Sequence, residues 1–156
     1  MDVRTATVED AEVILALIIE LAIYEKAEHE VVTTVDEIRE SIFGSHSKAS
    51  ALIAEVDNKP VAYAVYFYNY STWLGKNGIY LEDIYVSPEY RQQGIGKALL
   101  QRVSKIAVNQ NCGRVEWSVL DWNTPAIEFY ESLGAKPQDE WTVYRLSGDE
   151  LKNFAA

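Results

Sequence analysis

The residues with the clearest chemical meaning form a short glycine-containing segment. Residues 91–96 read RQQGIG, and apolar side chains recur at Ile95, Leu99, Val103 and Ile106, which is the spacing of one helix face. The first amides of a helix lack intrahelical partners and carry partial positive charge, so a helix beginning here predicts a site for phosphate or a similar anion. Glycine leaves the backbone open to such a ligand.

The same residues do not fit two common phosphate loops. A P-loop needs a glycine five residues before the Gly-Lys pair and Ser or Thr after it, but Arg91 and Ala98 stand there. The dinucleotide fingerprint needs a third glycine where Leu99 stands. The segment fits the pattern Arg/Gln-x-x-Gly-x-Gly/Ala after an acidic strand. The alternative interpretation is a glycine turn before an ordinary core helix.

Two neighbouring carboxylates precede this segment. Glu82 and Asp83 lie in IYLEDIYV, residues 79–86, whose β-branched and aromatic residues predict a strand. Neighbouring strand residues point to opposite faces, so at most one of the two acids is expected to face a bound amine directly. The pair is interpreted either as a solvated strand edge or as groups that bind a cation or accept its proton.

Length and composition favour one domain over residues 1–156. The single cysteine, Cys112, cannot form an internal disulfide, which agrees with a reducing cytoplasm. The apolar run from Val13 to Ile23 contains Glu20 and is too short to span a bilayer, and the N-terminus lacks the basic start of a signal peptide. We therefore expect a cytoplasmic protein without a secretion signal.

The formal net charge of −10 disfavours nucleic-acid backbones and anionic membranes as partners. It favours cationic ligands, although many proteins are acidic merely for solubility. Two histidines, His29 and His46, are too few and too isolated for a metal site, so no metal is expected.

The hydrophobic patterns predict the order β, α, α, β, β, β, α, β, α, β in one mixed α/β unit. Capping-box patterns at Thr7 with Asp10 and at Thr34 with Glu37 predict the first two helix starts. The predicted strands cover residues 3–6, 51–56, 61–70, 79–86, 115–120 and 141–146, and the predicted helices follow residues 10, 34, 94 and 124. Residues 71–78 are predicted to form a loop.

A second motif, DWNTPAIEFYESLGA at residues 121–135, strengthens the interpretation of the glycine segment. Together the two motifs resemble the GNAT superfamily of acetyl-CoA-dependent N-acetyltransferases. The resemblance implies a single-domain GNAT-like α/β fold, with a mixed, mostly antiparallel twisted sheet, helices on both faces and a splay between the two central strands. It also implies that the loop and the helix after it hold the CoA pyrophosphate.

Nearly the whole chain resembles the diamine (spermidine/spermine) and thialysine N-acetyltransferases, through residues 20–31, 71–86, 90–96 and 119–135. The resemblance implies a homodimer that uses acetyl-CoA. The implied cofactor residues are Ile84, Tyr85, Val86, Arg91, Gln92, Gln93, Gly94, Ile95, Gly96, Lys97, Asn123, Thr124, Pro125, Ala126 and Tyr130. The implied acceptor residues are Tyr24, Glu25, Glu82, Glu116, Trp117 and Ser118, and side-chain chemistry adds Trp73, Asp83 and Asp139.

Acetyl transfer needs a neutral amine, and an alkylammonium with a pKa near 10.4 must lose a proton first. The resemblance assigns Glu82 as the base and Tyr130 as the general acid at the thioester sulfur. Alternatively, Tyr130 packs the core. Glu25 and Asp139 would hold a distal cation, and Tyr24 and Trp73 would cover a methylene chain or a cation.

The sequence predicts an enzyme that transfers acetyl directly to a primary amine of a small cationic acceptor, a diamine or polyamine. The main alternative acceptor is thialysine or another amino acid, whose carboxylate would need a cationic partner such as Lys26. An alternative of another class is a non-catalytic acyl-CoA-binding regulatory module.

Overall fold

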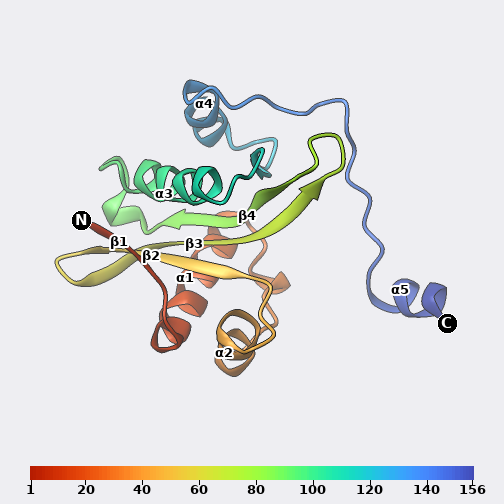
Figure 1. The fold of residues 1–156 in the computed structure, drawn as a ribbon. Coiled ribbons are helices and arrows are strands. Elements are labelled where there is room, and N and C mark those ends of the chain that lie inside the picture. The colour runs from red at the N-terminus through yellow and green to blue at the C-terminus, as the bar shows by residue number, and fades with distance from the viewer. The chain divides into compact units, whose positions relative to one another are not determined.

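Five strands form one sheet in the computed structural model, which describes residues 1–156 (Figure 1). The sheet order follows the chain, β1-β2-β3-β4-β5, with bounds Asp2–Thr5, Ser50–Val56, Lys59–Ser71, Lys76–Val86 and Val115–Trp117. The first four strands pair antiparallel, and β5 pairs parallel to β4. This is the mixed, mostly antiparallel sheet that the resemblance implies.

All five strands belong to the first of two units into which the chain divides, Met1–Ser118 and Val119–Ala156. In this first unit, α1 (Ala11–Tyr24) and α2 (Val35–Phe43) lie on one face of the sheet and α3 (Ile95–Asn109) lies on the other (Figure 1). Three one-turn 3₁₀ helices, η1 (Val8–Asp10), η2 (Glu28–Glu30) and η3 (Pro88–Tyr90), complete it. Helices therefore cover both sheet faces, as predicted.

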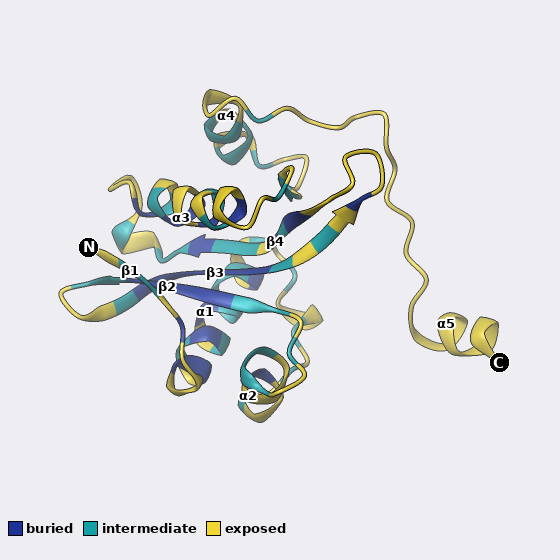
Figure 2. Ribbon diagram, in the orientation of Figure 1, coloured by how far each residue is buried: buried dark blue, intermediate teal, exposed yellow.

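The apolar faces of these helices form the core. On the first face, Ile14 and Leu17 of α1 and Ile38 of α2 pack with Tyr63 and Tyr85 of the sheet. On the second face, α3 buries one side of its surface, and Figure 2 shows buried residues concentrated between the layers of the first unit. The residues that α3 buries are Ile95, Leu99, Leu100, Val103 and Ala107. Burial of such side chains is worth roughly 1.5–3 kcal/mol each.

The start of α1 is fixed by polar contacts that hold it against the sheet. Thr7 and Asp10 form the predicted capping box, and Arg4 of β1 donates to both oxygens of Asp10, at 2.8 and 2.9 Å. Arg4 also contacts Glu55 of β2. The guanidinium beside Asp10 lowers the pKa of that carboxyl. Because α1 is anchored at this end, the position of its other end over β4 is defined.

The β3–β4 hairpin is longer than predicted. Half of the residues expected in a loop over 71–78 are strand, because Asn69 pairs with Gly78, Tyr70 with Asn77 and Ser71 with Lys76. Only residues 72–75 form the turn, and Gly75 adopts a φ of 64° that suits glycine. Cross-strand pairing in the sheet outweighs the polar composition of this segment.

The second unit, Val119–Ala156, holds α4 (Thr124–Ser132) and α5 (Gly148–Ala155). The predicted strand at 141–146 is wrong, because residues 141–147 form no helix or strand, and Val143 and Tyr144 are 85% and 92% exposed. An alternating pattern becomes a strand only where another strand accepts its hydrogen bonds, and this unit contains none. The predicted polar tail instead forms α5.

Two smaller differences concern the boundaries around α4. Strand β5 ends at Trp117 rather than Leu120, and the N-cap of α4 is Asn123 rather than Thr124. Pro125 stands in the first turn of α4, where its missing N–H costs no hydrogen bond. No helix of the structure has both the length and the apolar character needed to cross a bilayer.

Candidate functional site

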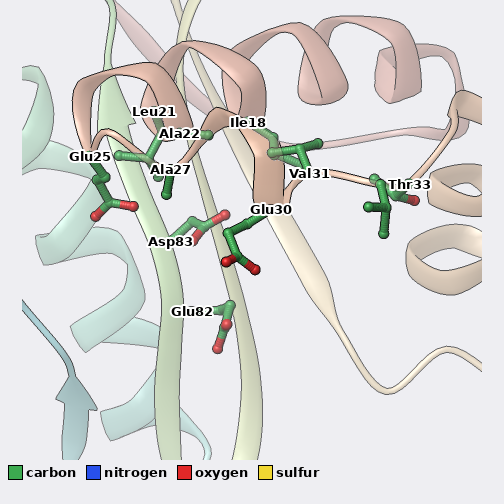
Figure 3. Close-up of a pocket in the computed structure, with 11 residues that line it drawn as sticks. Ile18, Leu21, Ala22, Glu25, Ala27, Glu30, Val31, Thr33, Glu82 and Asp83 are labelled. Atoms are coloured by element: carbon green, nitrogen blue, oxygen red, sulfur yellow. The ribbon is translucent and has the colours of Figure 1, made fainter. Parts of the chain in front are cut away.

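An acidic pocket lies in the first unit, between the C-terminal end of α1, the η2 segment and the middle of β4 (Figure 3). Its volume is about 400 Å³. Four carboxylates line it, Glu25, Glu30, Glu82 and Asp83. Ile18, Leu21 and Ala22 of α1 contribute an apolar wall, and no Lys or Arg belongs to the lining. The pocket therefore combines strong negative charge with a surface that suits methylene groups.

A β-bulge brings Glu82 and Asp83 to the same pocket. Val65 pairs with Asp83 and the next residue of β3, Tyr66, pairs with Leu81, so Glu82 is the extra residue of a β-bulge in β4. A bulge breaks the strict alternation of side chains along a strand. Strict alternation would place the two acids on opposite faces of the sheet, whereas here both line the pocket.

Asp83 is held from beneath by a buried tyrosine. The Tyr63 hydroxyl donates to Asp83 Oδ2 at 2.7 Å, and Tyr63 is fully buried among the residues of β3. Burial raises the pKa of Asp83, and the hydrogen bond from Tyr63 acts in the opposite direction. Burial, together with the nearby Asp83 charge, raises the pKa of Tyr63 well above its usual range, so its hydroxyl remains a donor.

Glu25 follows the last residue of α1 and faces the same pocket. Burial is the main cause that raises the pKa of Glu25, and the charge of Asp83 raises it further. Two carboxylates that repel each other in a partly buried pocket gain from a cation placed between them. The electrostatics of the pocket thus favour an ammonium group.

The predicted anion site lies on the other side of β4, at the start of α3. Gly94 is the N-cap of α3 and has a φ of 80°, and a Cβ added to it would meet no atom within 4 Å. The Ala98 N–H is bonded to the Gly94 carbonyl, so the amides of Ile95, Gly96 and Lys97 precede the first helical hydrogen bond. A Cβ on Gly96 would approach Val86 Cγ2 only to 3.8 Å. The glycine at 94 is thus required by the backbone conformation.

Arg91, the first residue of the glycine motif, points back towards α1. Its guanidinium carbon lies 5.0 Å from the ring centre of Tyr24 and 5.3 Å from that of Tyr85, and its Nε donates to the Val86 carbonyl at 3.0 Å. Tyr85 also donates to Glu20 of α1, at 3.2 Å. Cation–π contacts therefore link the loop before α3 to the end of α1.

One edge of β4 is only partly paired. Strand β5 pairs with Ile79, Tyr80 and Leu81, and its pairing ends at Trp117. Beyond that point, residues 83–86 are paired only with β3. The end of this pairing leaves Ile84, Tyr85 and Val86 on an edge of β4 without a second strand, at the place where the predicted splay would begin.

The remaining predicted acceptor residues of the first unit lie outside the pocket lining. Trp73 is in the β3–β4 turn and is 87% exposed. Glu116 of β5 is bonded to Arg114, at 3.1 Å, and to Asn69 Nδ2, at 3.4 Å. Trp117 pairs with Leu81, and the Ser118 hydroxyl is hydrogen-bonded to Tyr80.

The second unit carries the other predicted residues. Asn123 caps α4, Thr124, Pro125 and Ala126 form its first turn, and Tyr130 lies near its end, with its ring centre 5.7 Å from that of Phe129. Asp139 lies in the exposed segment after α4.

Sequence reasoning missed Tyr63 and Glu30. Glu30 lies in η2, where the pattern predicts no element, and nothing in the sequence connects it with β4. Tyr63 offered a faint signal, since VAYAVYF places a hydroxyl within a run of otherwise apolar residues that is predicted to be buried. A buried hydroxyl requires a partner, and the partner is Asp83.

Comparison with known proteins gives concordant matches. Residues 17–135 match the model described as the acetyltransferase (GNAT) family. Thialysine N-epsilon-acetyltransferase of Bos taurus is 39% identical, over 98% of this chain and 96% of that protein. Spermidine/spermine N(1)-acetyltransferase-like protein 1 of Homo sapiens is 35% identical, over 98% of this chain and 23% of that longer protein. An integron cassette protein of V. cholerae has a TM-score of 0.83 at 25% identity, covering 99% of this chain and 96% of that one.

Proposed function

The chain belongs to the acetyltransferase (GNAT) family and is an N-acetyltransferase, and we propose that its acceptor is a small primary amine with a second positive charge, a diamine or polyamine. The single observation that carries the proposal is the pocket with four carboxylates, an apolar wall and no basic residue. An alkylammonium group has a pKa near 10.4 and is charged at neutral pH, so such acceptors enter as cations. Their methylene chains fit the wall formed by Ile18, Leu21 and Ala22.

Thialysine is the second candidate acceptor, because the Bos taurus relative of that name is 39% identical over nearly the full length of this chain. Thialysine carries two amines and also a carboxylate. The pocket lining offers that carboxylate only like charges, which repel it. Lys26 follows Glu25 directly and is the proposed partner for the carboxylate in this alternative.

Acetyl-CoA, the co-substrate of this family, fits residues on the α3 side of β4. We propose that the amides of Ile95, Gly96 and Lys97 and the loop over Arg91, Gln92 and Gln93 hold its pyrophosphate, because the helix start supplies unpaired N–H groups. The open edge at Ile84, Tyr85 and Val86 suits its amide-containing arm, which would bond as an added strand does. The resemblance supports a proposed role in binding acetyl-CoA for Asn123, Thr124, Pro125, Ala126 and Tyr130 of the second unit.

The proposed chemistry divides the work among side chains of this protein. Acetyl-CoA supplies the activated acyl group. Glu82 accepts the proton of the acceptor ammonium, directly or through water, and Tyr130 Oη donates a proton to the leaving sulfur. Glu25 and Asp83 attract the cation, and Tyr24, Trp73, Glu116, Trp117, Ser118 and Asp139 remain proposed contributors to acceptor binding. Cys112 takes no part, because transfer to the amine is direct.

We further propose that residues 1–156 act as one GNAT domain in a cytoplasmic homodimer with small-molecule rather than nucleic-acid or membrane partners. The net charge of −10 supports the absence of polyanionic partners.

Matched acceptors test the proposed function. Initial rates of thiol release from acetyl-CoA would be measured with two pairs that differ only by a carboxylate: 1,5-diaminopentane with lysine, and bis(2-aminoethyl) sulfide with thialysine. We expect kcat/KM to be at least about tenfold higher for the carboxylate-free member of each pair, because every charged residue of the pocket lining is acidic and repels a carboxylate. The reverse order would favour the thialysine alternative. No acceptor-dependent thiol with any amine would favour the regulatory module.

A further inference from the structure

Beneath the proposed acceptor pocket lies a buried hydroxyl, that of Tyr63, which no chemistry described above requires. Tyr63 belongs to β3, is 0% exposed and is surrounded on its strand by Val61, Ala62 and Ala64, which are buried as well. A phenylalanine would fill this buried position by packing alone. The hydroxyl is nevertheless present, and it donates to Asp83 Oδ2 at 2.7 Å.

The register of the sheet explains how the two side chains meet. Tyr63 pairs with Tyr85, and Val65 pairs with Asp83, so Tyr63 and Asp83 are diagonal neighbours on the same face of the β3–β4 ladder. Diagonal neighbours are within reach of each other when one side chain is aromatic. Tyr63 is packed in the cluster beneath α1, so its ring cannot turn away without disturbing that cluster. The hydroxyl is therefore a fixed donor.

The geometry points to a positioning role: Tyr63, through its hydroxyl, holds the Asp83 carboxylate in the orientation and charge state in which it binds the acceptor ammonium. This inference rests on the proposed function and deepens it, because it gives the Asp83 carboxylate a fixed orientation in the pocket. With Oδ2 engaged by Tyr63, Oδ1 is left for the acceptor. Tyr63 itself needs no contact with the acceptor.

Asp83 would hold its charge poorly without this donor. The other titratable groups that face it are Glu25 from α1, Glu30 from η2 and Glu82 from its own strand, and all of them repel an anion. Burial acts in the same direction and raises the pKa of Asp83. The hydrogen bond from Tyr63 lowers the pKa of Asp83 and so opposes these effects. Replacing Tyr63 by Phe would remove that contact and keep nearly the same volume.

The sign of the expected pH effect follows directly. Removal of the hydroxyl raises the pKa of Asp83 further, so the carboxylate is protonated over a wider range of acidic pH. The acidic limb of kcat/KM for the diamine should move to higher pH in Tyr63→Phe, by roughly one pH unit. At the acidic end of the profile the amine KM should rise about tenfold, and kcat should change less, since binding rather than chemistry is affected.

A matched variant separates this role from a general loss of packing. Tyr66→Phe removes a hydroxyl from another buried tyrosine of β3, which lies opposite Leu81 and away from Asp83. We expect Tyr66→Phe to leave the acidic limb in place. In an Asp83→Asn background, Tyr63→Phe should have no further effect on the amine KM, because the group on which it acts is gone. Equal effects of both Tyr→Phe changes, or an undiminished Tyr63→Phe effect in the Asp83→Asn background, would overturn the inference.

A measurement without turnover distinguishes failure of this inference from failure of the proposed function. Carbon-13 NMR titration of the side-chain carboxyls reports the pKa of Asp83 in the whole protein, and calorimetry reports binding of 1,5-diaminopentane. An Asp83 pKa that rises in Tyr63→Phe supports the inference, and an unchanged one overturns it whether or not the enzyme is active. Absent diamine binding to the wild-type protein, with the Asp83 shift observed, would instead refute the proposed acceptor.

Discussion

The two ends of the proposed site are built by different means. At the start of α3 the backbone provides the binding groups, namely the amides that follow Gly94. In the pocket below α1, side chains provide them, namely four carboxylates from three segments of the chain. A backbone site depends on a few conformations and tolerates many side chains, whereas a side-chain site depends on each residue and on how it is held. The two ends should therefore respond to different substitutions.

The substitution with the largest expected effect on activity lies outside both the start of α3 and the acidic pocket. Tyr130 is proposed to donate a proton to the leaving sulfur, so Tyr130→Phe should lower kcat about a hundredfold or more and change the KM values of both substrates little. Steady-state kinetics with each substrate varied in turn measure this. Tyr144→Phe, at an exposed position of the same unit, is the control. Unchanged turnover in Tyr130→Phe would remove Tyr130 from the chemistry.

The next effect separates the two ends. Asp83→Asn removes a partly buried charge from the pocket, so kcat/KM for the diamine should fall about a hundredfold, which reflects the loss of a charge-assisted contact. The KM for acetyl-CoA should stay within about twofold, because the α3 end has no part in that contact. Parallel measurements of both constants test the separation. A similar loss in both would mean that the two ends are not independent.

A backbone change should produce the converse result. Gly94→Ala adds a Cβ at a position with a φ of 80°, where open space surrounds it but the conformation disfavours an L-residue. We expect the KM for acetyl-CoA to rise about tenfold, with the amine KM unchanged. Gly96→Ala is the control, since its Cβ would meet only Val86 Cγ2, at an ordinary 3.8 Å. Equal effects of the two substitutions would contradict the explanation from backbone conformation.

The same contrast explains what could be predicted from the sequence. The α3 end was predictable because its determinants are consecutive: a strand, Gly94 and a helix with a regular apolar face. The pocket was predictable only in part. Glu25 and Glu82 were expected in it through resemblance, but the bulge that turns Glu82 and Asp83 to one side depends on how β3 and β4 align, which no local pattern encodes. The Tyr63 contact depends on the same register.

The prediction of a strand at 141–146 was wrong for a related reason. A strand needs a neighbouring strand to pair with, and an alternating pattern alone does not specify one.

A smaller effect should separate the two acids that the bulge brings together. Glu82→Gln removes the proposed base but leaves the Tyr63–Asp83 contact, so the rising limb of the rate profile should move to higher pH by about one pH unit, as more of the amine must lose its proton to solvent. Glu28→Gln, at an exposed acid of η2 outside the pocket lining, should leave the limb in place. Rate profiles for both variants with 1,5-diaminopentane provide the measurement. A limb that stays fixed in Glu82→Gln would assign the base to another residue.

The smallest effect arises from charge at long range and has opposite signs at the two ends. The protein carries a formal net charge of −10, so it attracts a cationic amine and repels the anionic acetyl-CoA. Raising the ionic strength from about 0.01 M to about 0.15 M shortens the screening length from roughly 30 Å to roughly 8 Å. We expect kcat/KM for the diamine to fall about threefold over this range, while kcat/KM for acetyl-CoA stays constant or rises. Measurements in two salts at matched ionic strength control for specific ion binding. An equal fall in kcat/KM for both substrates would show that salt acts on the protein as a whole. The electrostatic contrast between the acidic pocket and the anion site at the start of α3 would then be contradicted.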